Sequence, residues 1–141
     1  MSASLTSLEG TIARTVVDGI GEAWARNNPN AFADAYTEDA SMILSGNRYF
    51  RGRETIRQVA TSQFGSAHSQ TTLLQNIVNV KALGADAMVV ITEGGVLAPN
   101  ETVPAPDRAI HATWVLARTN GSWLIAAYQN SRDADSALPG T

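Results

Sequence analysis

The sequence predicts an α+β fold, in which a cone-shaped, curved antiparallel sheet wraps around three helices from the N-terminal half. Apolar residues first recur at spacings of three and four, as in amphipathic helices. Beyond residue 70 the pattern changes to strands separated by turn segments. Helices and strands segregated in this way are typical of α+β domains. The 141 residues hold no repeat or linker, so we expect one domain over 1–141, with a frayed tail at about 133–141.

Three helices and one early strand are expected in the first half. The first helix covers about residues 5–27, where the apolar positions are Leu5, Leu8, Ile12, Val16, Ile20 and Trp24. A proline at 29 suits the first turn of a short second helix. Residues 39–44 then form a strand, closed by a turn at 45–47 and followed by an extended piece at 49–51. The third helix opens at 52–54, and its apolar face carries Ile56, Val59, Ala60 and Phe64.

Four strands are expected in the second half, at about 70–82, 86–97, 108–118 and 122–131. The last two are joined by Asn120-Gly121, which suits a two-residue hairpin turn because both central residues there need a positive φ. Counting outwards from this turn places Thr119 opposite Ser122, Arg118 opposite Trp123 and Trp114 opposite Ala127.

This register gives the hairpin two faces, neither polar enough for bulk water. One face carries Ile110, Ala112, Trp114, Leu116, Trp123, Ile125 and Gln129. The other carries His111, Thr113, Val115, Ala117, Leu124, Ala126, Tyr128 and Asn130. A strand pair that is apolar on both sides must be covered twice. We therefore expect a ligand cavity under the first face and a homodimer contact on the second, through His111, Thr113, Val115, Ala126, Tyr128 and Asn130.

Composition narrows the function classes. The chain has no cysteine, so it can form neither a disulfide nor a thiolate metal site, which fits a cytoplasmic location. The net charge of −3 argues against nucleic acid as a partner. No secretory or membrane-spanning apolar run is present, so no membrane partner is expected. The two histidines, His68 and His111, stand apart without clustered carboxylates, and we expect no metal. The absence of a glycine-rich dinucleotide turn and of a flavin motif argues against a cofactor and an oxidoreductase.

Several side chains are candidates for binding a ligand. Aromatic residues combine a large apolar area with a polar atom, and they suit a cavity for a mostly apolar guest. The same residues could equally be packed core. Gln75, Asn79 and Gln129 could add neutral hydrogen bonds. The aromatic candidates are Trp24, Tyr36, Tyr49, Phe50, Trp114 and Trp123.

Charged residues offer candidates for chemistry. Glu93 interrupts an apolar strand and could act as a general acid or base with a raised pKa, with Tyr36, Tyr49 and Gln129 as orienting groups. It could instead face solvent or pair with an arginine, and the sequence leaves open which face of its strand points inward. Asp39 suits backbone hydrogen bonds at a helix-to-strand junction. An arginine cluster could hold an anionic ligand or a carrier-protein phosphate, or form a solvated face paired with Glu54; it comprises Arg48, Arg51, Arg53 and Arg57.

Three segments resemble one superfamily in order and spacing. AWARNNPNAFADAYTEDA at 23–40 resembles the opening of the nuclear transport factor 2-like (SnoaL-like) superfamily. FRGRETI at 50–56 is similar to the segment that begins its third helix, and GSWLIAAYQN at 121–130 to its closing strand. The closing strand and the Arg-Gly-Arg-Glu turn at 51–54 look most like the SgcJ/EcaC-type branch, which often accompanies bacterial polyketide clusters, including those for enediynes.

The resemblance implies a cystatin-like cone fold, usually dimeric through the outer sheet face. It implies a small apolar or polyketide ligand, with a polyketide synthase or carrier protein as a further partner. In ketosteroid isomerase-like relatives, a catalytic carboxylate stands where this chain has Leu44, which cannot accept a proton. The expected function is therefore binding or sheltering of an enediyne-type polyketide intermediate. The alternatives are a cofactor-free cyclase, dehydratase or isomerase, and a non-catalytic dimerisation module.

Overall fold

The computed structural model describes residues 7–66 and 69–136, so His68 lies outside the described residues. Within them, no helix combines the length and apolar character needed to cross a lipid bilayer. The elements follow the expected order, and they are α1 (Leu8–Ala25), α2 (Pro29–Asp34), β1 (Tyr36–Leu44), β2 (Arg48–Arg51), α3 (Arg53–Phe64), β3 (Thr72–Ala82), β4 (Ala87–Leu97), β5 (Ala109–Thr119), β6 (Ser122–Arg132) and the 3-10 helix η1 (Asp133–Ser136).

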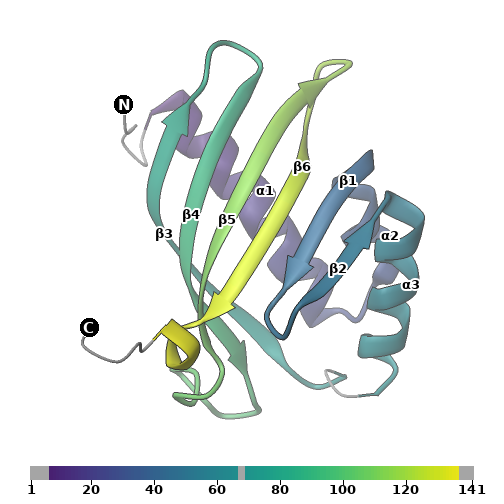
Figure 1. The fold of residues 1–141 in the computed structure, drawn as a ribbon, viewed down its shortest axis with the longest axis vertical. Coiled ribbons are helices and arrows are strands. Elements are labelled where there is room, and N and C mark those ends of the chain that lie inside the picture. Colours follow the sequence, from purple (N-terminus) through teal and green to yellow (C-terminus); the bar gives the residue numbers. More distant parts are fainter. Residues whose placement is uncertain (1–6, 67–68, 137–141) are drawn as a thin grey trace.

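The six strands form one curved, open sheet in the order β2-β1-β6-β5-β4-β3. The sheet is mixed rather than antiparallel as expected, because β1 pairs in parallel with β6. Figure 1 shows α1 crossing one face of β3–β6, while α2 and α3 lie beside β1 and β2. The α+β fold with three helices is confirmed. In the segment expected as a frayed tail, Asp133–Ser136 form η1, and residues 137–141 lie outside the described residues.

The hairpin turn is confirmed, but the register beyond it differs from the expected one. Asn120 and Gly121 have φ values of 51° and 83°. Leu116 pairs with Ile125, whereas Val115 pairs with Ala127, so Ala126 is an extra bulged residue. Trp114 therefore faces Tyr128 rather than Ala127. Since side chains alternate between faces, one extra residue moves every later side chain of β6 to the opposite face.

Two glycines of β4 let the neighbouring backbone segments approach it closely. Gly94 and Gly95 have φ values of 151° and 150°, which residues with a side chain rarely adopt. A Cβ at Gly94 would collide with the Leu74 carbonyl oxygen, and one at Gly95 with the Arg108 carbonyl oxygen. The neighbouring strands can thus approach β4 closely here, which glycine in a strand commonly permits.

The hydrophobic core lies between the helices and the sheet face that α1 covers. It includes Ala13, Val17 and Ile20 of α1 together with Trp114, Leu116 and Ile125 of the last hairpin. The rings of Trp24, Phe32 and Phe64 pack edge to face or tilted, with centroids 5.3 to 6.3 Å apart.

Apart from η1, which contacts β5 and β6 at one end, no described helix covers the opposite, outer face of β3–β6 (Figure 1). Apolar side chains on that face are only half-buried. They form a continuous aliphatic area, called the outer patch below, which consists of Val89, Ile91, Val115, Ala117, Leu124 and Ala127.

Candidate functional site

A cavity of about 490 Å³ lies between the inner sheet face and the three helices. Its walls come from α1, α2, α3, all six strands and two loops, at residues 45–46 and 107–108, and they are mostly apolar. Sites for small molecules commonly have this size and character. The aromatic members of the lining are Trp24, Phe32, Tyr36, Phe64, Trp114 and Tyr128.

Hydrogen bonds within the protein satisfy the donors of the two tryptophans. Trp24 Nε1 donates to Thr71 Oγ1 and Trp114 Nε1 donates to Thr92 Oγ1, each over 2.9 Å. Gln75 also lines the cavity, and its Nε2 donates to the Val17 carbonyl oxygen over 3.1 Å. These bonds fix the side chains in place, so the indoles offer apolar ring surface to a guest.

A small polar cluster interrupts the apolar wall. Asn130 Nδ2 donates to the Tyr128 hydroxyl oxygen over 3.1 Å, and Asn130 Oδ1 accepts from the Ser45 backbone N–H over 2.8 Å. Tyr36 lines the same cavity and is 1% exposed. Burial raises the pKa of Tyr128 to about 12 and, with a smaller contribution from the nearby Tyr128, holds the pKa of Tyr36 well above 10.0. Both phenols are therefore neutral donors at physiological pH.

Within the described part of the chain, the interior wall of the cavity carries no carboxylate. Leu44, the position that the resemblance matches to the catalytic acid of ketosteroid isomerase-like relatives, lines the cavity. Among the described lining residues the one acidic side chain is Asp107, which is exposed. The cavity can therefore bind and polarise a ligand through neutral donors, but the described interior offers no base that works near neutral pH.

The exposed members of the lining mark the mouth of the cavity, and most are charged. They are Gly46, Arg48, Asp107 and Arg132. Arg48 Nε donates to the Ser45 carbonyl oxygen over 3.0 Å. Arg108, half-buried nearby, holds both carboxylate oxygens of Glu101 with Nη2, at 2.7 and 2.9 Å. The guanidinium thereby keeps the pKa of Glu101 below its usual value, together with the larger contribution of the Ala98 N–H.

Glu93 is placed away from the cavity, on the outer sheet face. It pairs across the strands with His111, and Glu93 Oε2 lies 3.5 Å from His111 Nε2. On its other side His111 Nδ1 is 2.6 Å from Asp133 Oδ1, so the histidine ties η1 to the sheet. The hypothesis of Glu93 as a proton carrier for a cavity ligand is thus wrong on geometry. Among the described residues no group of three or more His, Asp or Glu is placed to hold a metal ion.

Several other predicted side chains do not reach the cavity. Tyr49 is 60% exposed on β2. Phe50 and Trp123 pack against the core without lining the cavity. Gln129, expected inside, is exposed on the outer face because of the bulge at Ala126.

The same bulge turns two residues of the expected dimer face inward. Tyr128 and Asn130 line the cavity instead. His111, Thr113 and Val115 do lie on the outer face, as expected. The sequence offers no signal for the bulge, because Ala126 and Ala127 suit either face equally.

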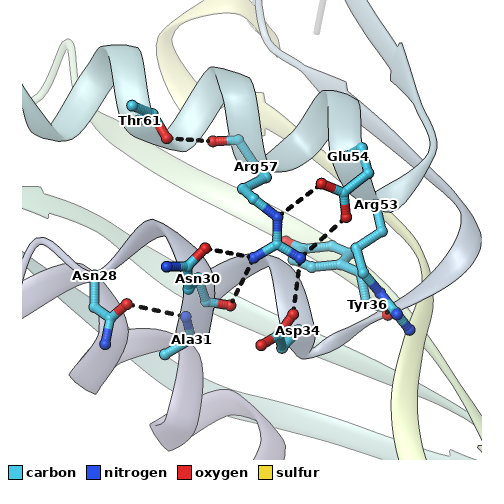
Figure 2. Close-up of polar contacts among 9 residues, drawn as sticks. All are labelled: Asn28, Asn30, Ala31, Asp34, Tyr36, Arg53, Glu54, Arg57 and Thr61. Atoms are coloured by element: carbon cyan, nitrogen blue, oxygen red, sulfur yellow. Dashed lines mark hydrogen bonds and ion pairs between the residues drawn. The ribbon is translucent and has the colours of Figure 1, made fainter.

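Two arginines of the predicted cluster, Arg53 and Arg57, are bonded within the protein (Figure 2). Arg57 contacts Glu54 of its own helix at 2.9 Å and Asp34 of α2 at 2.9 Å, and it donates to Asn30 Oδ1 over 2.7 Å. These contacts raise the pKa of Arg57, with the Glu54 bond the largest cause. Arg53 Nε donates to the Tyr36 carbonyl oxygen over 2.9 Å, which fixes the start of β1.

Asp39 also plays a local structural part. Its carboxylate accepts a hydrogen bond from the Thr37 hydroxyl over 3.1 Å, rather than the backbone bonds expected at a helix-to-strand junction.

Comparison with known families and structures gives one consistent result. The sequence profile of the SnoaL-like domain family matches residues 13–134. A domain of unknown function with a cystatin-like fold from Nostoc punctiforme is 20% identical, with a TM-score of 0.81 over 91% of this chain and 79% of that one. A ketosteroid isomerase-like protein from Erwinia carotovora atroseptica is 23% identical, with a TM-score of 0.69 over 90% and 98%. An NTF2-like protein from Novosphingobium aromaticivorans is 17% identical, with a TM-score of 0.77 over 92% and 84%. No protein of curated function matches the sequence.

Proposed function

Because the chain belongs to the SnoaL-like domain family, we propose that its cavity binds a small, largely apolar intermediate of bacterial secondary metabolism. The superfamily includes ketosteroid isomerase-like and polyketide cyclase members. The resemblance to the SgcJ/EcaC-type branch narrows the proposal to polyketide intermediates, including those of enediyne biosynthesis. The observation that carries the proposal is the aromatic-walled cavity of about 490 Å³, since a domain without a guest gains nothing from leaving such a volume unpacked.

The chemistry of the lining favours binding or sheltering over acid–base catalysis. Leu44 replaces the carboxylate of ketosteroid isomerase-like relatives, and Glu93 faces away. Both cavity phenols stay protonated near neutral pH. A dimerisation module with a filled core, the remaining alternative, does not account for the cavity.

Native mass spectrometry of the protein purified from its bacterial host tests this proposal. We expect an adduct of a few hundred daltons that organic solvent extracts. Leu44→Trp should fill part of the cavity and abolish the adduct. Gln129→Trp places the same side chain on the outer face and should retain it. An adduct that survives Leu44→Trp in a folded protein, or none in the wild type, would contradict the proposal.

A cofactor-free cyclase, dehydratase or isomerase is the second candidate, and the pair of cavity tyrosines favours it. A neutral phenol that donates to a carbonyl oxygen stabilises the charge that develops there during enolisation. Turnover of a bound intermediate that falls at least a hundredfold in Tyr128→Phe, with its affinity little changed, would establish this candidate over simple binding.

We also propose that a second copy of the chain covers the outer patch. Its half-buried aliphatic side chains and the absence of a covering helix in the described residues support this. Sedimentation at micromolar concentration should give a dimer, and Val115→Glu should give a monomer. A wild type that sediments as a monomer would overturn this assignment.

The cavity mouth suits a carrier protein or polyketide synthase as a further partner. Arg48 and Arg132 are exposed there and could meet the phosphate of a phosphopantetheine arm. Arg48→Gln should weaken the binding of an acylated carrier protein more than that of the free acyl amide. Equal effects on the two would remove this partner from the proposal.

A further inference from the structure

The orientation of one side-chain amide decides what the cavity offers to a ligand. Asn130 bonds to Ser45 on one side and to Tyr128 on the other. The Ser45 backbone N–H can only donate, so the atom facing it must be the amide oxygen. The amide nitrogen therefore faces Tyr128 and donates to its hydroxyl oxygen.

This leaves the Tyr128 proton available. Because its oxygen already accepts from Asn130, the hydroxyl must direct its hydrogen elsewhere. Among the described residues no acceptor takes that hydrogen. The ring itself is held by an edge-to-face contact with Trp114, with centroids 4.9 Å apart and planes at 80°. Tyr128 is thus a fixed donor on the cavity wall.

Tyr36 supplies a second donor to the same space. Its side chain is 1% exposed, and within the described part of the chain its hydroxyl makes no hydrogen bond, while no fully buried side-chain polar atom lacks a partner; the hydroxyl oxygen must therefore reach the cavity that Tyr36 lines. Tyr36 and Tyr128 line the same cavity from β1 and β6, which are neighbouring strands of the sheet. A buried hydroxyl normally has a partner, because leaving it unpaired costs free energy.

We propose that Tyr128 and Tyr36 together bind one acceptor oxygen of the ligand, a neutral carbonyl such as that of a ketone, aldehyde or ester. The inference rests on the proposed function and names the ligand class for the same cavity. A carbonyl oxygen has two lone pairs and no hydrogen, so it matches two donors. A hydrocarbon polyene would leave both donors unpaired, and a buried carboxylate would have no counter-charge on the described interior wall.

Asn130 is a positioning residue in this arrangement. The direction of its hydrogen bond to Tyr128 can be reversed with almost no change of side-chain shape. In Asn130→Asp, the atom that faces Tyr128 is a carboxylate oxygen, which accepts instead of donating. The Tyr128 hydroxyl then donates to residue 130 and no longer to the ligand. A merely structural role for Asn130 would not predict that a variant with an intact tyrosine behaves as if its hydroxyl were absent.

The test uses two probes of nearly equal shape, 2-acetylnaphthalene, which has a carbonyl, and 2-ethylnaphthalene, which has none. In Tyr128→Phe, we expect the dissociation constant of the ketone to rise about tenfold relative to that of the hydrocarbon, which is the effect of losing one hydrogen bond. Asn130→Asp should produce the same change, and Gln129→Leu, the neighbour on the outer face, none. The infrared carbonyl band of the bound ketone should lie below its position in hexane and return towards it in Tyr128→Phe.

The outcomes separate this inference from the function on which it rests. If both probes bind with a ratio that is unchanged in Tyr128→Phe, or if the bound carbonyl band matches that in hexane, the donor pair is wrong while the cavity still binds apolar guests. If neither probe binds, and Leu44→Trp leaves the adduct in native mass spectrometry unchanged, the cavity is not a binding site and both proposals are wrong.

Discussion

The two faces of the sheet carry similar apolar residues, but one face lines a cavity and the other is open to solvent or a partner. On the inner face, Trp114 is fully buried and Tyr128 is half-buried at the cavity wall, and the indole N–H and the phenol oxygen each make a hydrogen bond within the protein. On the outer face, aliphatic side chains such as Val115 are half-buried beside the charged pair His111 and Glu93. Apolar content alone therefore does not distinguish them. The two faces differ in how their polar groups are paired. On the inner face, neutral groups form hydrogen bonds inside the protein, whereas on the outer face, ionisable side chains pair in contact with solvent.

Substituting neighbours on β5 should give the largest contrast. Trp114→Ala removes a fully buried indole and should lower the free energy of unfolding by about 3–5 kcal/mol. Val115→Ala, one residue along on the outer face, should cost about 1 kcal/mol or less in the monomer. Urea unfolding followed by tryptophan fluorescence and circular dichroism measures both. Equal losses would show that the outer face is as tightly packed as the inner one.

The sequence predicts which side chains lie on each face of the sheet wherever successive residues of a strand alternate regularly between the two faces. The element order, the hairpin turn and the outward position of Thr113 follow from local patterns. The bulge at Ala126 does not, because it is set by how β6 fits between β5 and the parallel strand β1, a contact between distant parts of the chain. Because the bulge is not predicted, the inward position of Tyr128 and Asn130 is not predicted either. The Ser45 N–H that orients Asn130 is a backbone group, which no residue pattern can reveal.

A matched threonine pair tests the partnering of polar groups. Thr92→Val leaves the buried Trp114 indole N–H without its acceptor and should cost about 1–3 kcal/mol of unfolding free energy. Thr113→Val, exposed on the adjacent strand, should change stability by less than about 0.5 kcal/mol. Chemical denaturation gives both values. An insensitive Thr92 would mean that the indole finds another acceptor.

Within the cavity the two tyrosines should differ in the ligand-free protein. Tyr128→Phe leaves the Asn130 amide without its acceptor and should cost about 1 kcal/mol. Tyr36→Phe removes a hydroxyl with no partner among the described residues, so we expect stability unchanged or slightly raised. Thermal unfolding of both variants compares them directly. A Tyr36→Phe protein less stable than Tyr128→Phe would show that the Tyr36 hydroxyl already has a structural partner.

The outer face should contribute the smallest effect, and it should depend on pH. The Asp133 hydrogen bond, aided by the charges of Asp133 and Glu93, raises the pKa of His111 above 6.5. The folded state thus favours the protonated imidazole, so its stabilisation is fully present below about pH 6.5 and is lost as pH rises through the raised pKa.

All three side chains are about half exposed, so screening by solvent and salt keeps this term below about 1 kcal/mol. Melting temperatures at pH 6 and pH 8.5 should therefore differ slightly more for the wild type than for His111→Gln, and 1 M salt should remove the difference. Identical pH dependence in the two proteins at low salt would mean that the contact between η1 and the sheet adds nothing. The inner face should show no such dependence between these pH values, because both of its phenols titrate at higher pH.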